Sequence, residues 1–315
     1  MPAIMTHDFF GKDALDVVSR LLGFSTTDER DAFLLGNQGP DPFFYLVADP
    51  LARSSNLVGN LMHSSRPARL LATMREACDR VAGCDQAIAR AYLAGFLCHY
   101  LLDREVHPFV FSTQWSICDA GVDGLDRSAG SRVHEEIERD LDEMVLFTKL
   151  GVSVAEYRPY EEVLHGSPEV LGVAGRMVSR ANLFTYAVET DEWAFGEAVR
   201  LFRLVQRVFY SPKGTVRDTL GGLERQLLGA NYSLVAAMSH RVRRETTSIF
   251  DNRAHNAWTN PFTGEVRHES FWDLFDNALA KVEPAEQILF SQGFGEQAAV
   301  RLTRGLNFSG EPVEP

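Results

Sequence analysis

The run of residues 85–107 constrains the fold of this chain more than any other feature of the sequence. It is rich in helix-forming Ala, Leu, Gln and Arg, it begins at Asp85, a residue typical of helix starts, and Pro108 follows it. We therefore expect a long buried helix that stops at Pro108. Similar helical patterns occupy residues 12–23, 66–82, 131–149, 192–210, 216–244 and 269–283.

Strand patterns are scarce between these segments, which predicts an all-α fold, a multi-helix bundle. No internal repeat or low-complexity linker divides the chain, so we expect residues 1–315 to form a single domain. Residues 1–150 would carry the chemistry, and residues 151–315 would complete the bundle. The basic cluster at 240–244 is interpreted as a solvated helix face.

The formal net charge of -12 limits the classes of partner. Nucleic-acid binding rests on Lys and Arg contacts to phosphate, so an acidic chain makes that class unlikely, and it also opposes adhesion to anionic membranes. We expect a small-molecule substrate. Neither a secretory signal nor an apolar membrane-spanning run is visible, which predicts a cytoplasmic protein; the sequence does not predict its oligomeric state.

Two helical segments carry residues of the types that bind metals. His99, Asp103 and His107 lie four residues apart, and because such a series drifts only about 80° around a helix, all three can project from nearly one face. His134 and Glu138 repeat the four-residue spacing on a second segment. Imidazole and carboxylate are the ligands expected of zinc at a hydrolytic site.

One such pair alone is more often a hydrogen-bonded core histidine and a surface carboxylate than a metal site. His99 and Asp103, however, lie within an apolar run, where burying a carboxylate and an imidazole costs several kcal/mol unless an ion or partner compensates. Two pairs together with His107 therefore favour a zinc cluster between helices.

The order of the candidate ligands resembles that of the zinc-dependent phospholipase C family, whose distant relatives include the P1-type nucleases. That family has an early His, an Asp in a Gly-Pro-Asp turn, a further His, then His-x3-Asp, His and His-x3-Glu. The matching residues here are His7, Asp41, His63, His99, Asp103, His107, His134 and Glu138.

The resemblance implies two or three zinc ions per chain. A first ion would be held by Asp41, His63, His99 and Asp103, and a second by His107, His134 and Glu138. Asp103 would bridge to a third ion, completed by His7 and the N-terminal backbone. The family exposes an N-terminal Trp after leader removal, whereas this chain starts Met1-Pro2.

The resemblance implies a phospholipase C-like phosphodiesterase that acts on a phospholipid-like or other small phosphoester through metal-activated water. Asp41 is the candidate catalytic residue, which would orient or deprotonate that water. Choline preference is not implied, because Pro42 and Asn60 stand where the family has aromatic residues of its choline cage. The alternatives are a P1-type nuclease or nucleotidase, and a metal-binding protein without turnover.

Overall fold

The computed structural model describes residues 4–48, 56–123, 125–210 and 240–313. These residues form an all-α, multi-helix bundle, which confirms the predicted fold class. The α-helices are α1 (Ile4–Leu22), α2 (Thr27–Gly36), α3 (Asn56–Ser64), α4 (Pro67–Arg80), α5 (Asp85–Cys118), α6 (Gly130–Leu150), α7 (Pro159–Glu162), α8 (Pro168–Tyr186), α9 (Glu192–Phe209), α12 (Phe271–Ala280), α13 (Val282–Leu289) and α14 (Glu296–Thr303). The 3-10 helices are η1 (Asp41–Ala48) and η2 (Arg127–Ala129), and the antiparallel hairpin is β1 (Trp258–Thr259) with β2 (Val266–Arg267).

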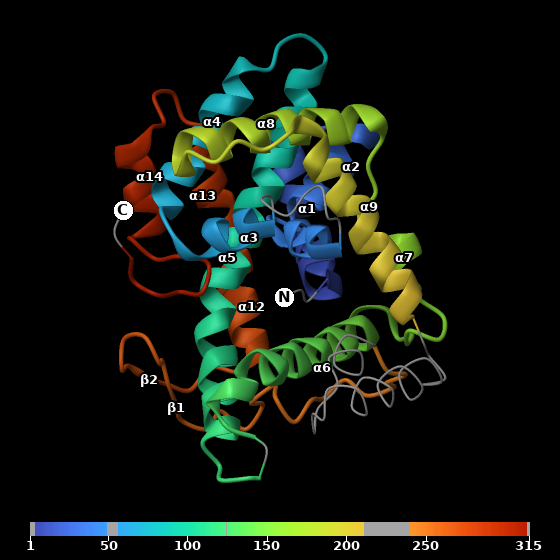
Figure 1. Ribbon diagram of the computed structural model, residues 1–315, viewed down its shortest axis with the longest axis vertical. Helices are drawn as coiled ribbons and strands as arrows, with labels where there is room; N and C mark the ends of the chain where they lie inside the picture. The colour runs from blue at the N-terminus through green and yellow to red at the C-terminus, as the bar shows by residue number, and fades with distance from the viewer. Residues whose placement is uncertain (1–3, 49–55, 124, 211–239, 314–315) are drawn as a thin grey trace.

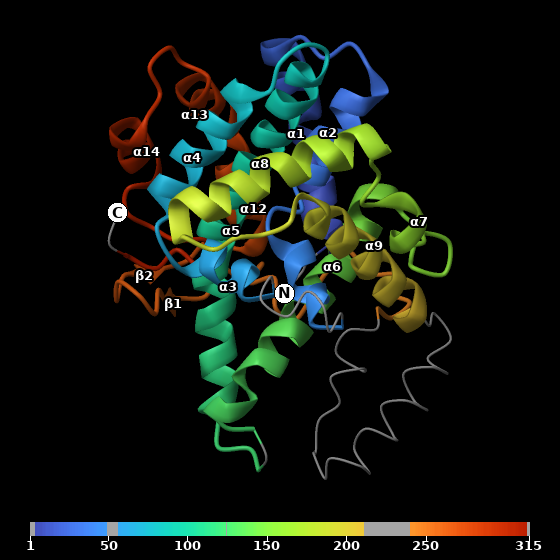
Figure 2. The same cartoon turned by 45° about the horizontal axis from the view of Figure 1, so that its top comes forward.

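Helix α5 is the central element of the bundle and runs along the long axis of the molecule (Figure 1). Helices α1, α2, α4 and α8 pack around its first half, while α6 turns away from its far end and also contacts α1. Figure 2 shows α8 lying across α4, with α9 and α7 beyond it. In the described part of the chain, no helix is long and apolar enough to cross a membrane.

The expected end of the central helix at Pro108 is wrong, because α5 continues to Cys118. A proline inside a helix costs about 3 kcal/mol through its missing N–H and its ring clash. Beyond that proline, Phe109 and Val110 are buried, and Phe109 packs on the Trp258 ring of the hairpin. This burial offsets the cost and extends the helix toward α6.

The predictions for the N-terminal helix and for residues 216–244 also need correction. Helix α1 begins at Ile4 rather than at residue 12, because its first turn is buried. Residues 216–239 of the expected helix at 216–244 lie outside the described residues, and residues 240–244 are not helical. The basic cluster is also not a solvated helix face, since Arg241 and Arg243 form ion pairs with Asp140 of α6.

Two glycines allow α2 and α5 to approach closely. A Cβ atom on Gly95 would lie 2.0 Å from the carbonyl oxygen of Phe33 and 2.9 Å from the Cα atom of Gly36. A residue larger than glycine at position 95 would therefore clash with the backbone of α2. The chain leaving α2 therefore passes directly over α5, one helical turn from His99. This contact brings the turn that contains Asp41 to the face of α5 that carries His99.

Helix α13 buries a carboxyl group away from the predicted site. Glu286 is fully buried, and its Oε1 atom lies 3.8 Å from the Sγ atom of Cys98. Burial raises the pKa of Glu286 well above its usual value. The folded chain therefore holds a proton there that the unfolded chain releases above about pH 4.5.

We predict that Glu286→Gln stabilises the protein increasingly as the pH rises. Below pH 4.5 both states of the native chain are protonated and the effect vanishes. Above pH 4.5, the native chain loses up to about 1.4 kcal/mol of unfolding free energy per pH unit, until the carboxyl group ionises in the folded state. The Glu286→Gln chain has no such carboxyl group and does not lose this stability. Denaturant unfolding between pH 4 and 8 measures this difference. Exposed Glu283→Gln on the same helix is the control, and parallel stability curves for Glu286→Gln and the native chain would contradict the prediction.

Candidate metal centre

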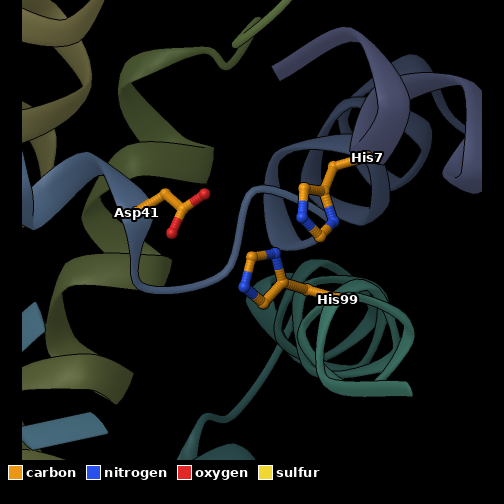
Figure 3. A group of neighbouring side chains, drawn as sticks. All are labelled: His7, Asp41 and His99. Atoms are coloured by element: carbon orange, nitrogen blue, oxygen red, sulfur yellow. The ribbon is translucent and has the colours of Figure 1, made fainter. Parts of the chain in front are cut away.

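Five elements bring the eight predicted ligands together. His7 comes from the first turns of α1, Asp41 begins η1 and His63 lies near the end of α3. Helix α5 supplies the three residues of the His99, Asp103 and His107 series, and α6 supplies His134 and Glu138. Figure 3 shows His7, Asp41 and His99 directed toward a common point from three different elements.

Asp103 lies at the centre of the first half of the site. Its Oδ1 atom is 3.1 Å from Nε2 of His7, whereas its Oδ2 atom is 3.1 Å from Nε2 of His99 and 3.8 Å from Nε2 of His63. Asp41 closes this half, with its Oδ1 atom 3.1 Å from Nε2 of His63. The two oxygens of Asp103 therefore face different imidazoles.

Glu138 occupies the equivalent place in the second half. Its Oε1 atom lies 3.2 Å from Nε2 of His107 and 3.0 Å from Nε2 of His134. Nδ1 of His107 lies 3.7 Å from Oδ2 of Asp103, so the two halves adjoin. Three groups have ligand atoms within 4.8 Å of one another and could hold a metal ion: His7, Asp41 and His99; His63, His99 and Asp103; and His107, His134 and Glu138. The first two groups share His99, so they are alternatives for that imidazole rather than independent sites.

Four of the five imidazoles are fixed through their second nitrogen. Each Nδ1 atom lies within hydrogen-bond distance of an oxygen, which orients the ring and leaves Nε2 facing the carboxylates. The pairs are His63 with Gly59 O at 2.7 Å, His99 with Asn37 O at 3.0 Å, His107 with Phe308 O at 2.9 Å, and His134 with Gln114 Oε1 at 2.9 Å. Metal-binding histidines in proteins are held in the same way.

Two ring nitrogens at the centre form no well-aligned hydrogen bond within the described residues, although one of them lies 3.1 Å from Oδ2 of Asp103. They are Nδ1 of His7 and Nε2 of His99, on rings that stack with centroids 4.1 Å apart. Unpaired buried nitrogens are costly, and a cation beside Nε2 of His99 would remove that cost. The residues present therefore fit a metal ion, although the assignment of each ligand stays a prediction.

The close packing of acids and imidazoles shifts their pKa values. Burial disfavours the charged form of Asp103, yet the nearby imidazoles of His107, His99 and His7 outweigh burial and hold its pKa well below the usual value. For His107, burial is likewise outweighed by Asp103 and Glu138, which raise its pKa to about 9. The site thus stabilises positive charge next to its carboxylates.

A turn of the chain and a helix cap set the positions of two ligands. Gly39, with a φ of +51°, lies against the His99 ring; a Cβ atom there would be 2.3 Å from its Cδ2 atom. At the start of α1, the buried Asp142 carboxylate accepts hydrogen bonds from the backbone N–H groups of Met5 at 3.0 Å and Thr6 at 2.7 Å. The acid caps the helix that carries His7.

The ligands border a pocket of about 140 Å³. Seven of the eight predicted ligands line it, together with the side chains of Phe44, Phe111 and Ser309. Among the described residues, no Lys or Arg lines this pocket. A bound anion there would meet imidazoles, any bound cation, two phenyl rings and one hydroxyl.

The C-terminal segment also contributes residues to the site. Phe308 is fully buried against the rings of His63 and His99, and its carbonyl oxygen fixes His107. Ser309 lines the pocket. Sequence reasoning missed these residues and Gln114, because none lies in a ligand-like spacing.

Fold and site together define an all-α protein with a buried centre of imidazoles and carboxylates that can hold metal ions. No protein-family model, curated protein or solved structure matches the chain. The chemistry of the site therefore has to be argued from its own geometry.

Proposed function

We propose that the chain is a zinc-dependent hydrolase of phosphate esters, a phospholipase C-like phosphodiesterase. One observation carries the proposal: five imidazoles and three carboxylates converge at one site, seven of these eight groups line one pocket, and four of the rings are fixed with Nε2 toward the carboxylates. Each of the three ligand groups contains two imidazoles and one carboxylate, a donor set that zinc hydrolases use. Two or three zinc ions per chain would fill the centre.

The charge of the pocket supports a phosphodiester as substrate. Asp41, Asp103 and Glu138 line the pocket, and within the described chain no cationic Lys or Arg accompanies them. Two divalent cations would exceed these three carboxylates by one positive charge and three by three, so the preference for a diester rests on two bound ions. A phosphodiester carries one negative charge, whereas a phosphomonoester carries close to two at neutral pH.

Bound zinc would polarise the phosphoryl group and make water acidic enough to attack at neutral pH. The residues of the chain would position the reactants. Asp41 borders the pocket beside His63 and would orient the attacking water or accept its proton. Phe44 and Phe111 would exclude bulk water from the phosphoryl group.

The proposal predicts that zinc-loaded protein hydrolyses bis-p-nitrophenyl phosphate at least about tenfold faster than p-nitrophenyl phosphate, because each tenfold requires only about 1.4 kcal/mol of better charge matching. p-Nitrophenyl phosphorylcholine and single-stranded DNA extend the panel to a phospholipase substrate and a P1-type substrate. Asp41→Asn protein, prepared identically, controls for contaminating phosphatases. Preferred cleavage of DNA would favour the nuclease, and hydrolysis of none of them would favour a metal-binding protein without turnover.

A further inference from the structure

The segment from Asn307 to Gly310 forms a tight loop beside the metal centre. The side-chain Oδ1 atom of buried Asn307 accepts hydrogen bonds from the backbone N–H groups of Ser309 at 2.9 Å and Glu311 at 3.0 Å. Its Nδ2 group donates to the carbonyl oxygen of Ser64 at 3.3 Å, and Ser64 is the last residue of the helix that carries His63. The loop is therefore anchored to the site at its base.

Helix α5 holds the same loop from the other side. The Tyr100 hydroxyl donates to the carbonyl oxygen of Leu306 at 2.7 Å, and His107 Nδ1 lies 2.9 Å from that of Phe308. Gly310 lies so close to α5 that a Cβ atom would be 2.6 Å from Cγ of Pro108. These contacts fix the loop relative to His107.

Ser309 lines the pocket, and its hydroxyl is free to bind a ligand. It lines the pocket with seven of the predicted ligands, and the only other lining side chains are two phenyl rings. Its backbone N–H is occupied by Asn307, whereas its Oγ atom has no hydrogen-bond partner within the described part of the chain. It is thus the one neutral hydroxyl donor among the described pocket residues.

We propose that Ser309 is a substrate-binding residue whose hydroxyl donates a hydrogen bond to a phosphoryl oxygen. The inference rests on the proposed function, because it requires a phosphoester in this pocket. A phosphoryl oxygen that no ion contacted would need a hydrogen-bond donor, because an anionic oxygen left without one in a partly buried pocket loses affinity. With no Lys or Arg lining the pocket in the described chain, Ser309 supplies that donor.

Calorimetric titration of zinc-loaded protein with inorganic phosphate tests this role without turnover. We expect Ser309→Ala to weaken phosphate binding about 10- to 100-fold, the range for a hydrogen bond to a charged acceptor, with unchanged zinc content. Ser309→Thr, which keeps the hydroxyl, should stay within about threefold of the native chain. Ser116→Ala, an exposed serine of α5, is the matched control.

Three results would overturn the inference: native protein that does not bind phosphate, Ser309→Ala within about twofold of native affinity, or loss of zinc from Ser309→Ala, which would mark a purely structural residue. Failure of the proposed function is detected by a different measurement, the hydrolysis of phosphoesters. If phosphate binding depends on Ser309 but no phosphoester is hydrolysed, Ser309 binds phosphoryl groups in a protein without turnover.

Discussion

Asp103→Asn is expected to lose at least one zinc ion per chain and to lower hydrolysis of bis-p-nitrophenyl phosphate by about three orders of magnitude, equivalent to about 4 kcal/mol. Asp103 is only 5% exposed, and its two oxygens face four imidazoles within 3.8 Å. Asparagine preserves the shape but removes the charge and one of the two oxygen ligands. No other described carboxylate lies near ligands of both halves of the site.

The readout that separates a metal ligand from a structural acid is the response to a chelator. A purely structural Asp103 would lower the melting temperature of the metal-loaded and metal-free proteins equally. If Asp103 is a metal ligand, its substitution would instead reduce the difference in melting temperature between the metal-loaded and metal-free proteins. Asp276→Asn, the same chemical change at an exposed position of α12, is the control. Native zinc content and a native chelator response in Asp103→Asn would contradict the assignment.

Removing zinc from the native chain is expected to lower its melting temperature by about 10 °C. An ion present at about a thousand times its dissociation constant adds about 4 kcal/mol of stability, and each kcal/mol corresponds to about 2–4 °C in a domain of 150–250 residues. The ions would join α1, η1, α3, α5 and α6, which meet at this site. After the ions are lost, the buried imidazoles and carboxylates would have only one another as charge and hydrogen-bond partners.

Thermal unfolding before and after treatment with two unrelated chelators, EDTA and 1,10-phenanthroline, measures this effect. Zinc added back in slight excess should restore the original melting temperature, which excludes damage by the chelator itself. A melting temperature insensitive to both chelators, in protein shown to have lost its metal, would reject the idea that the ions connect the helices.

The sequence carries much of the information for the fold and for the ligand pattern. Helical periodicity predicts α4, α6 and α9 nearly to their ends, and spacing alone places His99 and Asp103, or His134 and Glu138, on one helix face. These features depend on neighbouring residues within one helix. The ligand roles themselves stay predictions.

Contacts between distant segments could not be predicted in the same way. The continuation of α5 past Pro108 depends on burial against the hairpin, and the role of Phe308 depends on where the C-terminal segment packs. Gln114 lies twenty positions before its partner His134, on a different helix. Local helix propensity does not depend on such contacts between distant segments, so it could not predict the end of α5 or the roles of Phe308 and Gln114.

Metal content per chain tests the central claim most directly. Native protein, purified without chelator or added metal, would be analysed for all first-row divalent metals by inductively coupled plasma mass spectrometry. The arrangement of His7, Asp41, His63, His99, Asp103, His107, His134 and Glu138 predicts two or three zinc ions per chain. Fewer than one bound ion per chain, before and after incubation with zinc, would contradict the account.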